Sequence, residues 1–286
     1  MNYDHAFHAG NFADVVKHVV VSRIVDYLKR KDKPFRVIDT HAGSGLYDLS
    51  SESAQRTGEW RSGIGRLIGA DLPPEAHRLL QPYLDAVAAF NPATGLRFYP
   101  GSPVLVRHML RSRDRLTAIE LHPAASAALK DHFSGDFQSR VIALDGWLAL
   151  GAHVPPKEKR GLVLVDPPFE IEDEFSRIVD GLRRAHARWP NGIYALWYPL
   201  KDRDAAASFR RSMRESGIPR ILDIVLSVRA PAHPPRLDGS GLIVVNPPFV
   251  LESELRAVLP TLCVVLAEDS GASWSVEWLS GEAVPG

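Results

Sequence analysis

The most regular pattern in the chain is a short apolar run that ends in an acidic residue. It occurs at residues 35–39, 116–120, 141–145 and 162–166, which end in Asp39, Glu120, Asp145 and Asp166. Short apolar runs rich in β-branched residues and closed by a turn are typical of buried strands. Because parallel strands end at the same edge of a sheet, the pattern predicts four carboxylates along that edge.

Segments with apolar residues at helical spacing separate these runs. They cover residues 13–30, 75–90, 104–110, 124–133, 175–189 and 205–216. Ser102 stands where its side chain would cap the third of these helices. A further strand is expected at 193–199, followed by a hairpin of 221–228 and 242–245 around a proline-rich loop. Strands that alternate with helices predict an α/β fold with a mainly parallel sheet.

Residues 46–100 interrupt this alternation. The distance from Asp39 to Glu120 is too long for one strand–helix–strand unit, and prolines and glycines punctuate the segment around its one clear helix. We therefore expect one sheet domain built from residues 1–45 and 101–286, with residues 46–100 as a small helical insertion subdomain.

Composition narrows the class of protein. The 286 residues are 45% hydrophobic, and Lys+Arg and Asp+Glu are each 34, so nucleic-acid binding would depend on local patches. The single cysteine, Cys263, excludes an intramolecular disulfide and favours a reducing compartment. No apolar run is long enough to span a bilayer, no signal-like stretch opens the chain, and the histidines show no metal-ligand spacing. We expect a soluble, cytoplasmic protein with no membrane or metal partner.

The first predicted strand leads into a glycine-rich turn. Asp39 stands four residues before Gly43, and Gly45 follows, which gives the spacing D-x-x-x-G-x-G. Glycines allow the backbone to approach a ligand closely. This spacing favours S-adenosylmethionine over NAD, whose G-x-G-x-x-G turn is absent. With this cofactor, the series of strand-end acids assigns Glu120 to the ribose, Asp145 to the adenine amine of the cofactor and Asp166 to the chemistry.

The fourth strand continues as Asp166-Pro167-Pro168-Phe169. Proline lacks an N–H group, so this stiff loop leaves carbonyl oxygens free to accept hydrogen bonds. An exocyclic amine on an aromatic base attacks poorly until acceptors hold its hydrogens. Asp166 and the Pro167 carbonyl would be those acceptors, and Phe169 would stack on a base taken out of its helix. The tetrad resembles the (D/N/S)-P-P-(Y/F/W) motif of amino-methyltransferases.

A second copy of the tetrad, Asn246-Pro247-Pro248-Phe249, follows the strand predicted at 242–245. It lies late in the chain, where such sheets carry their antiparallel edge, and no glycine turn precedes it. Only a carboxylate can take up a proton, so we expect Asp166 to be catalytic and the second copy to have no catalytic role.

Several further stretches accompany the tetrad, and the N-terminal one is far more specific than the tetrad itself. They are Tyr3-x-His5-x-Phe7-His8-Ala9-Gly10-Asn11, continued by Lys17-His18, then Asp39-Thr-His41-Ala-Gly-Ser-Gly45, Tyr99-Pro-Gly-Ser-Pro103, Glu120-Leu-His-Pro123 and Tyr194-Ala-Leu-Trp-Tyr-Pro199. Through them essentially the whole chain resembles the family of ribosomal RNA large subunit methyltransferase J. The main departure is Phe169, where many relatives have Tyr.

The resemblance implies a Rossmann-like methyltransferase with a helical insertion, S-adenosylmethionine as donor and 23S ribosomal RNA as partner. The expected reaction is methylation of N6 of one adenine. The residues expected to line the cofactor site, with Gly43 added from the glycine turn, are His18, His41, Gly43, Ser102, Glu120, Asp145, Gly146 and Asp166. We assign Tyr3, Lys17 and Phe169 to the RNA, and Asp166, Pro167 and Phe169 to catalysis.

Other classes of protein remain as alternatives. A DNA adenine-N6 methyltransferase would use the same chemistry, but the near-zero net charge and the lack of a DNA-reading motif argue against it. A catalytically inactive RNA-binding module is disfavoured by the complete set of strand-end acids. An NAD-dependent oxidoreductase and a metal hydrolase lack their motifs. We expect the protein to be a monomer.

Overall fold

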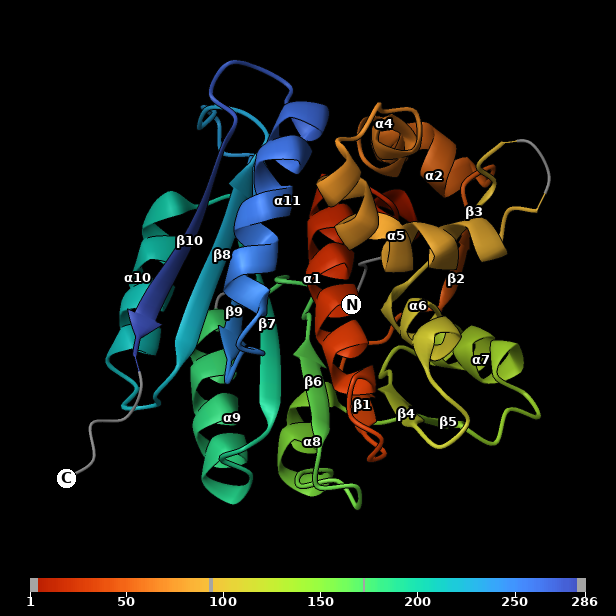
Figure 1. Ribbon diagram of the computed structural model, residues 1–286, viewed down its shortest axis with the longest axis vertical. Helices are drawn as coiled ribbons and strands as arrows, with labels where there is room; N and C mark the ends of the chain where they lie inside the picture. The colour runs from red at the N-terminus through yellow and green to blue at the C-terminus, as the bar shows by residue number, and fades with distance from the viewer. Residues whose placement is uncertain (1–4, 93–94, 172, 282–286) are drawn as a thin grey trace.

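The computed structural model describes residues 5–92, 95–171 and 173–281 and is built around one eight-stranded sheet (Figure 1). The strands lie in the order β10-β8-β9-β7-β6-β1-β4-β5. Their bounds are Arg36–Asp39 for β1, Arg115–Ile119 for β4, Ser139–Ile142 for β5, Gly161–Val165 for β6, Ile193–Leu200 for β7, Ile221–Ser227 for β8, Gly239–Val245 for β9 and Ser273–Ser280 for β10. The predicted α/β fold is confirmed, and it is Rossmann-like.

Helices cover both faces of the sheet, because the buried strands β1, β6 and β7 are apolar on both sides. One apolar cluster joins one face to α1 (Phe12–Lys29), α6 (Ser102–Met109), α7 (Pro123–His132) and α11 (Leu251–Leu266). The other cluster joins the opposite face to α8 (Gly146–Ala152), α9 (Glu174–Arg188) and α10 (Arg203–Arg214). Figure 1 shows α1 and α11 side by side across the first face. No helix among the described residues is long and apolar enough to cross a membrane.

The chain reverses its direction of travel across the sheet beside β1. From β1 it proceeds outward to β4 and β5, and it then returns to β6 on the other side of β1 and continues to β7. These five strands are parallel, so their carboxyl ends form one edge. In open α/β sheets, ligands bind outside the carboxyl ends at such a switch point.

Residues 46–100 pack against the first face of the sheet domain. The elements are β2 (Leu46–Asp48), α2 (Glu52–Thr57), α3 (Glu59–Ser62), α4 (Ile64–Ile68), α5 (Pro74–Ala89) and β3 (Phe98–Pro100), with β2 and β3 forming a separate pair. Helix α5 contacts α1, α6 and α11, and its apolar stripe, including Leu80 and Tyr83, belongs to the same cluster as the sheet. The segment therefore extends the first core rather than forming a core of its own.

The structure corrects two local predictions and adds elements for which none was made. Strand β5 ends at Ile142, not at Asp145, because Asp145 leaves the sheet and caps α8: its Oδ1 accepts a hydrogen bond from Trp147 N at 2.9 Å. Ser102 is the first residue of α6 rather than its cap, and its hydroxyl donates to Asp39 Oδ2 at 2.6 Å. Helices α8 and α11 and strand β10 were not expected from the sequence.

Candidate active site

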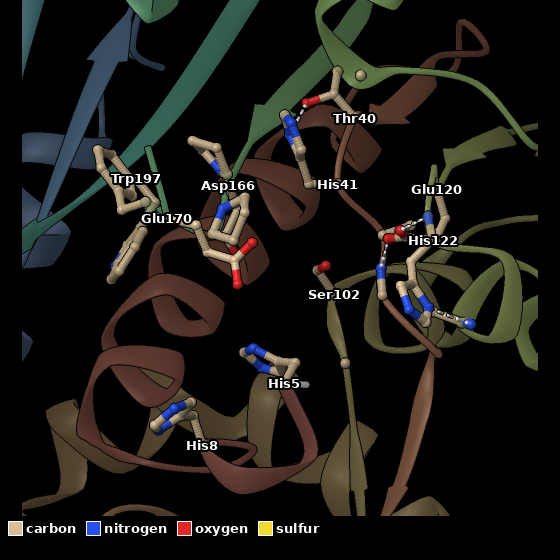
Figure 2. Close-up of a pocket in the computed structure, with 18 of the residues that line it drawn as sticks. His5, His8, Thr40, His41, Ser102, Glu120, His122, Asp166, Glu170 and Trp197 are labelled. Carbon is tan, nitrogen blue, oxygen red and sulfur yellow. Dashed lines mark hydrogen bonds between the residues drawn. The ribbon is translucent and has the colours of Figure 1, made fainter. Parts of the chain in front are cut away.

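A cleft of ≈ 810 Å³ opens at the carboxyl edge of the parallel strands. Figure 2 shows that its labelled side chains come from the N-terminal segment, from the turns after several strands and, for Trp197, from strand β7 itself. The predicted site residues that line it are Lys17, His18, His41, Gly43, Ser102, Glu120, Asp145, Gly146, Asp166, Pro167 and Phe169. Tyr3 lies outside the described residues.

Lys17 connects α1 to the end of β6. It is 4% exposed, its Nζ donates to Asp166 Oδ2, and it lies 2.8 Å from Asp14 Oδ1 one turn earlier in the helix. Burial lowers the pKa of Lys17, but the negative charges of Asp14 and Asp166 together raise it by more, so the pKa lies above its ordinary value. The ammonium group is therefore a fixed positive charge that holds Asp166 in one orientation.

Asp14 is held from several sides. Gly10 N donates to its Oδ2 at 2.9 Å, His5 Nε2 lies 3.0 Å from the same oxygen, and Asn11 caps α1 by accepting from Asp14 N at 3.0 Å. Burial raises the pKa of Asp14, while Lys17 and His5 lower it well below its ordinary value. The charges of Asp14, Lys17 and Asp166 thus alternate in sign from α1 to the end of β6.

Phe169 has a left-handed backbone conformation, with φ at 52°. Such a conformation is uncommon for a residue with a side chain and is maintained where the surroundings fix it. The ring packs against Phe175, with centroids 4.9 Å apart, and against Trp197, at 5.5 Å. Trp197 also lines the cleft, so two aromatic rings stand beside Asp166.

Glu120 follows β4 and closes the glycine turn after β1. Its Oε2 accepts from Gly43 N at 2.8 Å, and its Oε1 accepts from His122 N at 2.7 Å. Gly43 has φ at 64°, and a Cβ at this position would lie 2.3 Å from the hydroxyl of Tyr47. Each carboxylate oxygen has a second lone pair, which remains available to a donor in the cleft.

Gly146 fits a narrow gap beside the turn after β1. A Cβ on this residue would lie 2.1 Å from Thr40 O and 2.9 Å from His41 Nε2. Thr40 uses its hydroxyl hydrogen on Leu164 O at 2.9 Å, so its oxygen accepts from His41 Nδ1 at 2.9 Å. Burial, and the positive charge of Arg177, lower the pKa of His41 to about 3. The ring is therefore neutral, with Nε2 as an acceptor.

His18 is buried between aromatic side chains. Its Nδ1 lies 2.7 Å from the hydroxyl of Tyr99, which lies 3.1 Å from that of Tyr83. Burial lowers the pKa of His18 to about 3, so the ring is neutral. Its Nε2 is buried and has no hydrogen-bond partner among the described residues, although His18 lines the cleft. A ligand can satisfy this nitrogen.

Asp39 ends β1 but is not among the cleft-lining residues. It is 0% exposed and accepts from the Ser102 hydroxyl, as described above, and from His41 N at 3.3 Å. Burial raises the pKa of Asp39 to about 7, and the negative charge of Asp166 acts in the same direction. Of the four predicted acids, Glu120, Asp145 and Asp166 therefore line the cleft. The fourth, Asp39, is buried and holds the cleft-lining Ser102.

The second tetrad lies elsewhere. Strand β9 is antiparallel to β7, so Asn246 follows it at the opposite edge of the sheet from Asp166. The Asn246 amide donates to Pro190 O at 2.7 Å and to Gly192 O at 2.8 Å. Phe249 is 79% exposed. The second copy fixes a loop and lies outside the cleft, as expected.

Comparison with known proteins identifies the family. The family described as Ribosomal RNA large subunit methyltransferase D, RlmJ, matches residues 32–280. The chain belongs to this family. Two RlmJ relatives, each called Ribosomal RNA large subunit methyltransferase J, agree over nearly the whole length. The Escherichia coli protein is 42% identical over 283 residues, covering 99% of this chain and 100% of the relative. The Haemophilus influenzae protein is 40% identical over 284 residues, with the same coverage.

A solved crystal structure has the same fold. The crystal structure of a Legionella pneumophila protein matches with a TM-score of 0.87 and 34% sequence identity, covering 95% of this chain and 98% of the other. The resemblance read from the sequence is therefore confirmed. Membership of the RlmJ family implies S-adenosylmethionine as the methyl donor.

The cleft fits that donor. Glu120 and Asp145 offer carboxylate oxygens, His41 offers a neutral acceptor and His18 an unsatisfied nitrogen, while Gly146 packs too closely against Thr40 to carry a side chain. These groups match a ligand that carries hydroxyls, an amino group and a flat base.

Sequence reasoning missed several cleft-lining side chains. Trp147 stacks under the Arg177 guanidinium, 4.8 Å from its ring centroid, and stands edge-on to His41. Trp197 lies within a stretch that the family resemblance used, yet it received no role. His8 belongs to the N-terminal stretch that the resemblance used and also received no role of its own. It lines the cleft, and its Nδ1 lies 3.0 Å from Glu59 Oε2 in α3. No local pattern indicates that contact, because 51 residues separate the partners.

Proposed function

We propose that the protein transfers a methyl group from S-adenosylmethionine to the N6 amine of one adenine in 23S ribosomal RNA. Family membership supports the methyltransferase activity and the class of RNA. The choice of an exocyclic amine rests on the loop that begins at Asp166. When bound, S-adenosylmethionine supplies a methyl group on a positively charged sulfur, which is already a strong electrophile and needs neither a covalent nucleophile nor a metal.

The roles of the loop residues follow from their positions. Asp166 and the Pro167 carbonyl hold the two amine hydrogens, which turns the nitrogen lone pair toward the methyl group. Lys17 keeps the Asp166 carboxylate in place. After transfer the nitrogen must lose one proton, and Asp166 is the carboxylate beside it. Positioning of this kind supplies much of the rate of a bimolecular reaction.

Phe169 and Trp197 hold the target base. Their rings lie 5.5 Å apart at 71° to each other and both line the cleft. A base taken out of an RNA helix gains about 1–3 kcal/mol from stacking on one aromatic ring. Phe169→Ala should therefore weaken capture of the RNA, whereas Phe169→Tyr should be nearly silent.

The observation that carries the proposal is the shared cleft. Asp166, Glu120 and Asp145 line it together beside Lys17, whereas Asn246 lies at the other edge of the sheet. We also propose that the active unit is a monomer. A ribosomal RNA substrate supports action in the cytoplasm. We also infer that residues 46–100 form an insertion subdomain that shares the core of the sheet and supports the cleft through Tyr47, which lines it, and Glu59, which contacts His8.

Single-turnover methylation of an unmodified 23S rRNA transcript tests the proposal. Asp166→Asn keeps the shape of the side chain but loses its charge, so the rate should fall by roughly 10²–10⁴-fold, the range for losing a positioned general base. Asn246→Ala should stay within a few fold of wild type. DNA of the same sequence should not be methylated. An active Asp166→Asn protein beside a folded but inactive Asn246→Ala protein, or methylation of the DNA alone, would overturn the assignment.

A further inference from the structure

A second hollow of ≈ 260 Å³ lies beside the cleft, between α10 and strands β8 and β10. The two hollows share one turn of the chain: Pro199 and Lys201 line the cleft, whereas Leu200 and Arg203 line the second hollow. Strand β8 runs parallel to β7, because both are antiparallel to β9, so its last residue lies at the same edge of the sheet as the cleft. The second hollow is thus a lateral continuation of the substrate edge.

Polar groups line this hollow. The hydroxyl-bearing residues Ser227, Ser273 and Ser275 come from β8 and β10, where Ser273 pairs with Ser227. Across from them, Arg203 donates from Nη2 to Ser227 Oγ at 3.2 Å. The Nε of Arg203 is buried and has no hydrogen-bond partner in the described part of the chain. One donor of this guanidinium is therefore unsatisfied within the protein.

The nearby acids are committed to other groups. Asp223 Oδ2 lies 2.6 Å from Arg210 Nε, and Glu277 Oε2 lies 2.9 Å from Arg210 Nη2. Asp202 caps α10 by accepting from two backbone N–H groups at its start. Within the described ranges, no ion pair involves Arg203. The charge of Arg203 is therefore available to an anion.

We propose that this hollow binds a backbone phosphate of the RNA strand whose target base occupies the cleft. The inference rests on the proposed function for the identity of the strand. A guanidinium beside hydroxyl groups is the chemistry that holds a phosphate, and phosphate contacts fix the register of a nucleic acid on a protein. Arg203 would set which nucleotide reaches Asp166 by holding the chain a short distance away from it.

The test compares Arg203→Gln with Arg211→Gln in the full-length protein. Arg211 is on the same helix and exposed, does not line the hollow, and carries the same charge. The probe is an unmodified 23S rRNA fragment, with binding measured by fluorescence anisotropy from low to moderate salt. Arg203→Gln should weaken binding about tenfold, the lower end for a charge-assisted hydrogen bond. It should also reduce the salt slope by about 0.7, the value for one phosphate contact on a single strand.

Two further readouts separate this role from a structural one. KM for the fragment should rise in Arg203→Gln while kcat at saturating RNA and binding of S-adenosylhomocysteine stay unchanged, and Arg203→Lys should recover most of the loss. Ser275→Asp leaves Arg203 unchanged in the sequence and adds a carboxylate to the lining of the hollow, which repels a phosphate. It should weaken RNA binding to a similar extent. This variant keeps the test valid if Arg203→Gln does not fold.

The outcomes are distinct. The subsite would be overturned if Arg203→Gln and Arg211→Gln changed the RNA affinity and the salt slope of binding to the same extent. This holds whether both slopes stay at the wild-type value or both are reduced. A wild-type protein that binds the fragment through Arg203 but does not methylate it would overturn the proposed function and leave the phosphate subsite standing.

Discussion

Lys17→Met tests how the charged centre of the cleft is held together. Lys17 is 4% exposed, lies 2.8 Å from Asp14 Oδ1 and also donates to Asp166. Methionine is similarly long and flexible but uncharged, so the substitution removes the ammonium group and preserves most of the packing. The two carboxylates then stand together without the cation between them.

The cost follows from the burial of the pair. Removing one partner of a buried ion pair costs about 3–5 kcal/mol. The lower end applies here, because Asp14 keeps Gly10 N at 2.9 Å and His5 Nε2 at 3.0 Å, and the Asp166 side chain is 13% exposed. We expect the free energy of unfolding at pH 7 to fall by about 3 kcal/mol. Lys29→Met, near the end of the same helix, is the control and should change it by less than about 0.5 kcal/mol.

The loss should depend on pH. Burial raises the pKa of Asp14, but Lys17 and His5 lower it well below its ordinary value. A carboxylate whose folded pKa is depressed contributes stability above its unfolded pKa of about 4, and loses that contribution as the pH falls through the folded value. Without Lys17 most of this contribution disappears. The difference between wild type and Lys17→Met should therefore be largest at pH 7 and shrink below about pH 4.

Urea unfolding followed by circular dichroism at pH 7 and at about pH 3 measures both quantities for the wild type, Lys17→Met and Lys29→Met. A difference at pH 7 smaller than about 1 kcal/mol, the size of an exposed ion pair, would refute the buried pairing as a source of stability. A difference of the same size at both pH values would show that lost packing, rather than charge, is responsible.

Three other substitutions probe the cofactor side and the insertion. Glu120→Ala should weaken S-adenosylhomocysteine binding in calorimetry by about 1–3 kcal/mol, and unchanged affinity would remove Glu120 from the ribose role. Gly146→Ala should destabilise the fold by about 1–3 kcal/mol in thermal unfolding, because its Cβ would lie 2.1 Å from Thr40 O; a wild-type transition would mean that α8 can shift. Glu59→Gln removes the carboxylate that holds the cleft-lining His8, so KM for RNA should rise by about threefold. Cofactor binding is the control and should not change. Equal losses of RNA affinity and cofactor affinity would indicate general destabilisation.

The sheet and its substrate edge could be predicted because their signal is local. An apolar run and its closing acid occupy only a few residues, and Glu120 and Asp166 follow β4 and β6 directly into the cleft. Asp39 has the same local pattern but is 0% exposed and bound to Ser102. Periodicity cannot distinguish an acid that faces a ligand from one that faces the core, because that depends on which helix packs above the strand.

Long-range contacts gave no such signal. Lys17 and Asp166 are 149 residues apart, and no spacing rule relates a buried lysine in a helix to a distant strand end. Helix α11 was missed because Pro260 stands inside it and proline predicts a helix end. Strand β10 was missed because it is an edge strand with several exposed residues, so its apolar pattern is weak.

The two tetrads show why a motif acquires function only from its place in the fold. Both end in Pro-Pro-Phe, yet the left-handed residue is Phe169 in one and Asn246 in the other, each with φ at 52°. The direction of the preceding strand sends Asp166 into the cleft and Asn246 to the opposite edge. There the Asn246 amide donates to two carbonyl oxygens, a contact that a carboxylate cannot make because it has no hydrogen to donate. The amide at one site and the carboxylate at the other are thus each required by their surroundings, and the tetrads are not interchangeable.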